Sequence, residues 1–143
     1  MSNFSKFFKE NVIIRENIKM PISDRFLDEK GNPIEWEIRA LSIPEDENIQ
    51  KDCQIQVPVP GKRGVFTSQL DTPKYVRKLA VACTAYPDLH DKDLQNSYGV
   101  MGAEALLAKM LLPGEYATYI DEIQKICGYN ESLGDLEEEA KNS

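Results

Sequence analysis

The chain has 143 residues, of which 41% are hydrophobic and 29% are charged, and its net charge is −7. These totals fit one soluble globular domain of ordinary size. The negative charge disfavours binding to nucleic-acid phosphates, and the longest apolar run is shorter than the ~20 residues of a membrane span.

The beginning of the chain shows no signal-peptide pattern, because Lys6 and Lys9 are followed by no apolar region and no cleavage site. Cys53, Cys83 and Cys127 form no CxxC pair and no zinc-binding pattern. We therefore expect a cytosolic protein with reduced thiols and with neither a metal nor a cofactor.

Three aromatic residues near the start, Phe4, Phe7 and Phe8, have helical spacing. They predict a short amphipathic helix over residues 3–10. Docking of its aromatic face on the core is the favoured interpretation. Contact with a partner is the alternative, because the burial of apolar area drives both.

A β-hairpin is predicted next. Residues 12–22 indicate a loop and then an edge strand running towards Leu27, because Pro21 is tolerated mainly at a sheet edge. A turn cluster fills residues 28–33. Apolar and polar residues then alternate over residues 34–40, as in a half-buried strand.

The following segment predicts a helix and a loop. Ser42 and Glu45 have the spacing of a capping box, so a helix should begin there and end between residues 51 and 53. Residues 57–64 predict a loop, with Lys62 and Arg63 between its glycines. The phosphate-loop pattern is absent, so we expect a structural turn or a partner contact.

Two further helices are predicted before the centre of the chain, one beginning at Thr72 and ending at residues 86–87, and a short one over residues 88–97. His90 lies among acidic residues, which we interpret as helix-capping groups rather than metal ligands. No catalytic serine or cysteine pattern is present, so no catalytic residue is assigned and the protein is not expected to be an enzyme.

The most apolar stretch lies at residues 100–112, where ten of thirteen residues are apolar. It predicts a helix that begins at Gly102, stops before Pro113 and is buried on nearly every side. A last helix should run from about Glu115 to Gly128. The expected fold is α+β and predominantly helical, with one N-terminal β-hairpin packed against a C-terminal helical bundle. Residues 1–130 would form a single domain and residues 131–143 an acidic tail.

Three segments carry a resemblance to a known family. They are YGVMGAEALLAKMLLPGEY at residues 98–116, the run from Arg25-Phe26 through EWEIRALS ending at Ser42, and VPVPGKRG at residues 57–64. In order and spacing, the chain from about residue 7 to 128 resembles the XkdN-like tail assembly chaperones of tailed bacteriophages and PBSX-like prophages.

This resemblance implies a non-enzymatic chaperone in the cytoplasm of the bacterial host. It would bind the tape measure protein and keep it soluble during tail morphogenesis, and it would not be retained in the mature virion. A structural tail component is the alternative. Contact with the tail tube protein and self-association stay open. The residues predicted to bind a partner are Lys62, Arg63, Tyr98, Met101, Leu107, Met110, Leu111 and Tyr116.

The resemblance also implies a second product made by programmed ribosomal frameshifting near the end of the gene. Residues 140–142 can be encoded as GCA-AAA-AAC, which contains a slippery heptamer. The alternative is an ordinary polar tail, because a protein sequence does not fix its codons.

Overall fold

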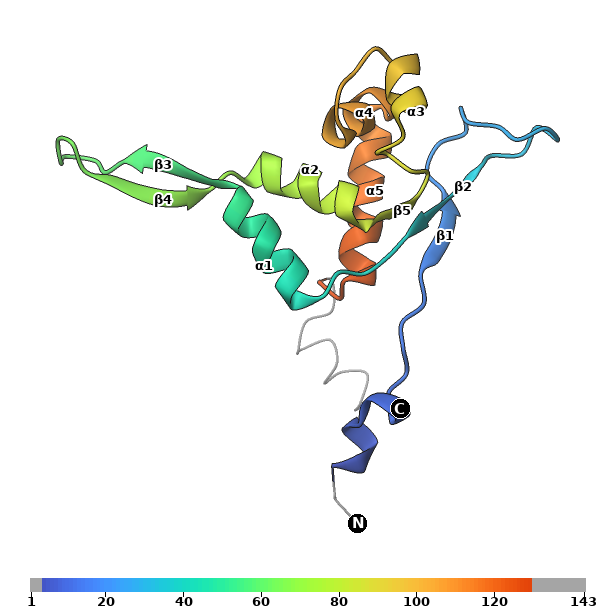
Figure 1. The fold of residues 1–143 in the computed structure, drawn as a ribbon, viewed down its shortest axis with the longest axis horizontal. Helices are drawn as coiled ribbons and strands as arrows, with labels where there is room; N and C mark the ends of the chain where they lie inside the picture. The colour runs from blue at the N-terminus through green and yellow to red at the C-terminus, as the bar shows by residue number, and fades with distance from the viewer. Residues whose placement is uncertain (1–3, 130–143) are drawn as a thin grey trace.

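The computed structural model describes residues 4–129, and these form two separate antiparallel sheets and five α-helices (Figure 1). A three-stranded sheet has the order β1-β2-β5, and a two-stranded sheet consists of β3 and β4. The expected acidic tail and the expected frameshift site lie outside the described residues.

The N-terminal β-hairpin is present, but its first strand lies earlier than predicted. Strand β1 (Ile18–Pro21) pairs with β2 (Glu35–Ile38), with Ile18 opposite Ile38. Near Leu27 only an isolated bridge to Pro33 remains. The chain between the end of β1 and this bridge leaves the sheet, and Arg25 there pairs with Glu115 of α5 (Pro113–Ile126).

Two strand regions lie beyond the N-terminal hairpin. Strand β5 (Thr84–Tyr86) pairs with β2, and β3 (Gln54–Pro58) pairs with β4 (Phe66–Leu70) in a second hairpin. The sequence predicted only a loop at residues 57–64. Its prolines and glycines obscured the short strands on either side.

The predicted fold class is therefore wrong. Of the described residues, 44% are helical and 18% are in strands, so the fold is mixed α/β and not predominantly helical. Nor is there a single N-terminal hairpin on a helical bundle. The three residues of β5 are too few to show a pattern of alternation, and only pairing with a strand distant in sequence defines them.

The helices are centred on α2, which touches α1, α4 and α5 and also contacts β5 of the three-stranded sheet. Their bounds are α1 (Ile43–Asp52), α2 (Thr72–Cys83), α3 (Lys92–Ser97), α4 (Ala103–Met110) and α5 (Pro113–Ile126). The core forms where the helices meet the sheet. There, the rings of Trp36 and Tyr119 pack edge to face with centroids 5.4 Å apart.

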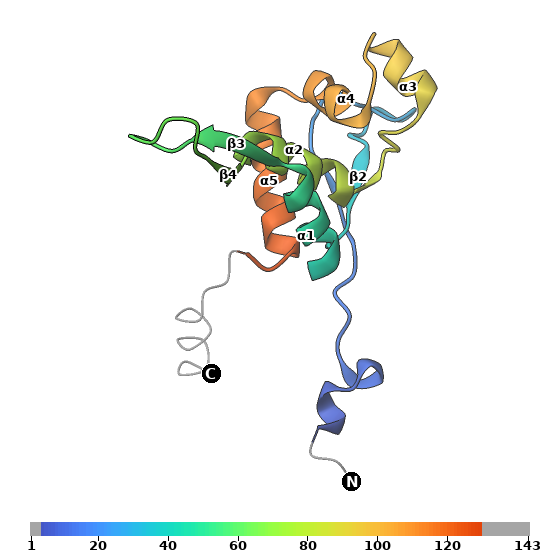
Figure 2. The ribbon, with the colours of Figure 1, turned by 60° about the vertical axis from the view of Figure 1, so that its left-hand side comes forward.

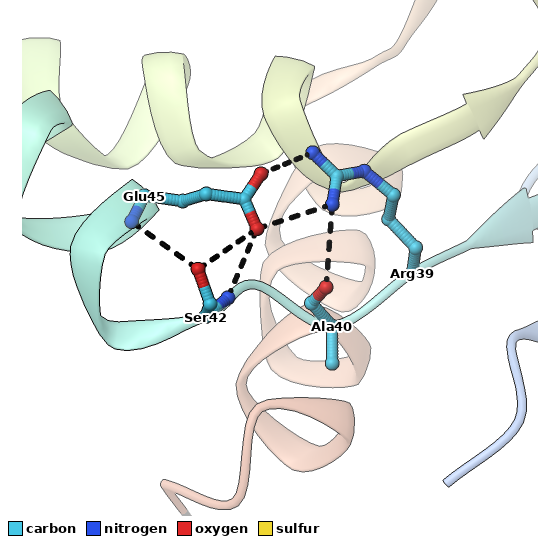
Figure 3. Close-up of polar contacts among 4 residues, drawn as sticks. All are labelled: Arg39, Ala40, Ser42 and Glu45. Atoms are coloured by element: carbon cyan, nitrogen blue, oxygen red, sulfur yellow. Dashed lines mark hydrogen bonds and ion pairs between the residues drawn. The ribbon is translucent and has the colours of Figure 1, made fainter. Parts of the chain in front are cut away.

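The predicted capping box at the start of α1 is confirmed (Figure 3). The Ser42 hydroxyl accepts a hydrogen bond from the Glu45 N–H at 3.4 Å, and the Glu45 carboxylate accepts one from the Ser42 N–H at 3.1 Å. Arg39, just past β2, pairs with the same carboxylate at 2.8 Å. The strand is thereby joined to the helix that follows it.

The most apolar stretch forms α4, and its predicted start at Gly102 is confirmed. Gly102 has φ +96°, a conformation that side-chain-bearing residues rarely adopt, so glycine suits this cap. Leu106, Leu107 and Met110 are buried, but Ala108 is exposed. Burial on nearly every side is therefore not observed, and one face of the helix meets solvent.

The start of the chain does not dock on the core. Instead of one amphipathic helix there are two 3₁₀ turns, η1 (Ser5–Phe7) and η2 (Lys9–Asn11), with no buried residue. This stretch extends away from the folded body in both views (Figures 1 and 2). Phe7 is 80% exposed and Phe8 46%, so the helical spacing did not lead to burial of these side chains.

Candidate partner-binding surfaces

The predicted partner-binding residues do not form one surface, because three of them are part of the core. Leu107, Met110 and Leu111 are buried where α4 turns into α5. In this conformation their side chains pack mainly within the chain. They belong to the core cluster in which α4 and α5 pack against α2.

The other five predicted residues reach solvent to different degrees. Met101 is 91% exposed in the loop before α4, whereas Tyr98 and Tyr116 are half-buried at the edge of the core. Lys62 and Arg63 are exposed in the loop between β3 and β4. Whether any of them binds a partner stays a prediction.

The most exposed apolar surface includes the residues that the sequence predicted as a helix docked on the core and those of the predicted loop that follows it. We call residues 5–14 the N-terminal segment. Phe7 is 80% exposed, Ile13 95% and Ile14 73%, and Phe8 and Val12 are also exposed. A soluble domain rarely exposes so many neighbouring apolar side chains unless they bind something.

One arginine attaches this segment to the folded body. Nη1 of Arg15 donates hydrogen bonds of 3.0 Å to the carbonyl oxygens of Lys125 and Ile126 at the end of α5. A cation is favourable at this end of a helix, where the carbonyl groups leave partial negative charge. Arg15 therefore marks the point beyond which the N-terminal segment leaves the body.

One sequence signal could have indicated this exposure. Val12, Ile13 and Ile14 are consecutive, and neighbouring residues of an extended chain point to opposite faces. A buried run of this kind needs cover on both sides. No second apolar layer is available around an edge segment, so a partner or solvent must supply that cover.

The β3–β4 hairpin is a second projecting surface (Figure 1). Within the described chain neither strand pairs with any strand other than its partner, so both outer edges present unpaired backbone groups. Phe66 is 58% exposed, and Ile55 and Val65 are exposed as well. The basic loop at its tip has no acidic residue beside it in sequence.

A third surface borders α2, where two hollows share Arg77. The guanidinium of Arg77 lies 5.6 Å from the ring centre of Tyr116. We call the two hollows together the α2 groove. The first, of about 490 Å³, is lined by Asp71, Pro73, Lys74, Arg77, Lys78 and Glu104. The second, of about 260 Å³, is lined by Arg77, Leu107, Ala108, Leu111, Pro113 and Tyr116.

A second arginine–glutamate pair fixes the junction of α4 and α5. Nη2 of Arg25 lies 2.6 Å from Oε1 of Glu115 and donates to the carbonyl oxygen of Met110 at 2.7 Å. Glu115 also accepts from the N–H of Leu112 at 2.8 Å. The hydrogen bonds from Arg25 lower the pKa of Glu115 to about 2. These charged groups hold the helix ends in place.

Among the acidic residues around His90, Asp91 caps the following helix as predicted, and Asp88 stabilises the turn before it. The carboxylate of Asp88 accepts from the His90 N–H at 3.0 Å, and that of Asp91 accepts from the Leu94 N–H at 2.8 Å. Over residues 4–129 no group of three potential metal ligands is found, and no helix in that range is long and apolar enough to cross a bilayer.

Comparison with known proteins connects the chain to phage proteins. A family model described as "Phage XkdN-like tail assembly chaperone protein" matches residues 4–141. The phage-like element PBSX protein XkdN of Bacillus subtilis (strain 168) is 33% identical over 141 residues, covering 98% of this chain and 94% of that protein.

A second protein of the same strain, the uncharacterized protein YqbN, is 30% identical over 141 residues, covering 98% of this chain and 93% of its own. The fold is similar to the crystal structure of the protein YqbN, with a TM-score of 0.74 and 24% identity. That likeness covers 91% of this chain and 99% of the solved one.

Proposed function

Because the chain belongs to the family of XkdN-like phage tail assembly chaperones, we propose that it binds the tape measure protein and keeps it soluble during tail morphogenesis. The family is one of assembly chaperones and is generally non-enzymatic. The proposed activity accordingly consists of binding and release, with no catalytic step and no cofactor.

The observation that supports this proposal most directly is the exposed apolar N-terminal segment. Phe7, Ile13 and Ile14 are all more than two-thirds exposed, at 80%, 95% and 73%. Apolar surface of this extent lowers the free energy of the system when a partner covers it. The segment extends beyond Arg15, so it can contact a client while the core stays folded.

The chemistry of the client explains why such a surface is useful. A long helical chain that waits for tail tube subunits exposes apolar surface, and exposed apolar surface leads to aggregation. Aromatic and branched aliphatic side chains on the chaperone cover that surface reversibly. The acidic balance of the chaperone, −7 overall, keeps the complex soluble through charge repulsion between complexes.

The proposal is tested by co-expressing the chain with the tape measure protein of the same prophage and measuring the soluble client. The test variant is Phe7→Ser/Ile13→Ser/Ile14→Ser. A suitable control is Ile43→Ser in α1, because this side chain is 74% exposed but lies outside the segment. We expect the triple variant to lose most of the soluble client and the control to retain it.

The same triple variant should fold normally, because its substituted side chains are exposed and surface substitutions usually change stability by less than ~0.5 kcal/mol. Circular dichroism during thermal unfolding checks this point. A folded triple variant that solubilises the client as well as the wild type would remove the N-terminal segment from the binding surface. Failure of the wild type itself to solubilise the client would refute the proposed function.

The alternative function is that of a structural tail component. The second sheet gives the fold more β-structure than the single hairpin predicted from the sequence, so the fold does not argue against this alternative. Mass spectrometry of purified particles separates the two functions. We propose that the chain acts in the host cytoplasm and is absent from mature virions, whereas stoichiometric copies in the particle would establish a structural role. Co-purification from the same cells tests the tail tube protein and a second copy of the chain as partners.

We also propose a second, longer product made by ribosomal frameshifting, and sequencing the gene tests it. An intact heptamer at the codons of residues 140–142, with an open reading frame overlapping in the shifted frame, supports frameshifting. If the codons interrupt the heptamer, the proposal of slippage at this site fails.

A further inference from the structure

The α2 groove is basic although the chain as a whole is acidic. Lys74, Arg77 and Lys78 line it together with Asp71 and Glu104. Glu104 pairs with Lys78 at 3.5 Å, and Asp71 accepts a hydrogen bond from the backbone N–H of Lys74 at 3.3 Å. Neither the Lys74 nor the Arg77 side chain has a carboxylate partner among residues 4–129. Two cations thus remain available to acidic groups of a partner.

Contacts within the chain orient the Arg77 side chain but leave one of its hydrogen-bond donors without an acceptor among the described residues. Its guanidinium lies over the Tyr116 ring at 5.6 Å, and its buried Nε atom has no acceptor within the described residues. A guanidinium binds carboxylates through its planar fork of donors. The position of Arg77 between the two hollows makes it the residue at which acidic and apolar contacts of one ligand would meet.

Beyond Arg77 the groove becomes apolar. Leu107 and Leu111 are buried in its floor, and Ala108, Pro113 and Tyr116 complete the lining. An apolar side chain placed in such a hollow is the usual anchor of a protein–protein contact. The groove therefore suits a ligand with a carboxylate close to an apolar side chain.

The walls of the groove favour a helix over an extended peptide. Most of the lining residues belong to α2, α4 and α5, whose interior backbone groups are hydrogen-bonded within each helix. An extended segment needs an open strand edge for its own backbone groups, and no strand residue lines either hollow. A helix satisfies its backbone internally and needs only side-chain contacts.

We propose that the α2 groove binds an acidic amphipathic helix of the client, with a carboxylate at Lys74 and Arg77 and an apolar side chain over Leu107 and Leu111. That the helix belongs to the tape measure protein rests on the proposed function. The preference for an acidic over a basic helix follows from the groove alone.

Two designed helical peptides test this preference with the full chain. Both carry the same stripe of leucines, and the flanking positions are Glu in one and Lys in the other. Fluorescence anisotropy should show binding of the Glu peptide and none of the Lys peptide at the same concentration. Added salt should weaken the binding of the Glu peptide, because ionic screening reduces charge attraction at partly exposed sites.

Matched variants locate the site. The Lys74→Glu/Arg77→Glu variant should bind the Glu peptide with an affinity lower by about tenfold or more. Lys51→Glu/Lys109→Glu changes the net charge equally at exposed positions outside the groove lining and should leave binding unchanged. Because Arg77 also contacts Tyr116, Ala108→Gln is a second variant, which fills the apolar hollow from an exposed position and should also weaken binding.

Two outcomes would overturn the proposal. In the first, the Glu and Lys peptides bind equally well. In the second, the Glu peptide binds, but neither groove variant weakens its binding. If a peptide of residues 131–143 binds the groove more tightly than the Glu peptide, the occupant is the acidic tail of this chain and not the client. If the wild-type chain binds the Glu peptide but does not solubilise the client, the proposed function is refuted and the groove remains a site.

Discussion

The N-terminal segment and the stretch that forms α4 and the start of α5 are both rich in large apolar residues, yet their environments are opposite. Leu106 and Leu107 are fully buried, whereas Ile13 is 95% exposed. The difference lies in what surrounds each region. The helix α4 packs against α2 within the core cluster, whereas the N-terminal segment passes beyond the last element that could cover it.

This difference shows that the segments that carry the family resemblance mainly build the fold. The stretch at residues 98–116 supplies the core and also Glu115, which pairs with Arg25 from the second segment. Arg39 from the same segment pairs with Glu45 at the start of α1. We therefore look for the client surface in the N-terminal segment, outside these segments, and in the α2 groove, whose apolar hollow is built by α2 together with residues 98–116.

The largest effect is expected in the buried region. Leu107→Asp places a charge without a partner in the core, which costs several kcal/mol, on the order of the whole stability of a domain. We expect it to unfold the chain, as measured by circular dichroism and urea titration. Ala108→Asp on the exposed side of the same helix is the control and should stay folded. A folded, soluble Leu107→Asp variant would show that this face of α4 is a surface.

A smaller effect is expected at the edge of the buried region, where the hydrogen bonds from Arg25 hold the pKa of Glu115 at about 2, well below the ordinary value of a glutamate. Because the folded state keeps this group ionised more strongly than the unfolded state, the stabilisation is complete above the unfolded pKa and is lost as the pH falls towards 2. Glu45, with a pKa of about 2 beside Arg39, acts in the same direction.

Urea unfolding at neutral pH and at about pH 3 measures this dependence. The midpoint of the wild type should fall on acidification. In Glu115→Gln the fall should be smaller and the midpoint at neutral pH lower, because one of the two depressed carboxylates is absent. An unchanged pH dependence in this variant would mean that the Arg25 pair does not contribute to stability.

The smallest effect is expected at the tip of the β3–β4 hairpin. Lys62→Glu/Arg63→Glu should weaken client binding only a few-fold, since charges at the rim of an interface contribute little. Its thermal stability should equal that of the wild type, because both side chains are exposed. Complete loss of client binding by this folded variant would place the hairpin, and not the N-terminal segment, at the centre of the interface.

Several local features were predictable because neighbouring residues determine them. Ser42 and Glu45 cap α1 through contacts three residues apart, and Gly102 begins α4 because its conformation suits glycine. The buried face of α2, with Leu79, Ala80 and Cys83, follows helical periodicity. In each case the deciding interaction lies within one turn of the chain.

The hairpin at residues 54–70 was missed although Ile55 and Val57 alternate with glutamines in β3. Prolines and glycines at residues 58–64 indicated a loop, and the two strands beside it were too short to outweigh that signal. Strand β5 was missed for another reason. Its three residues become a strand only because β2, more than forty positions earlier, offers a free edge.

The candidate surfaces divide in the same way. The sequence alone determined that an apolar helix would begin at Gly102 and stop before Pro113, and it indicated the family. Only the tertiary structure decided which apolar side chains are covered, because burial depends on elements brought together from distant parts of the chain. Ile13 and Leu107 are similar in chemistry, but only Leu107 lies in the buried cluster that residues of α2, α5 and the sheet form with it.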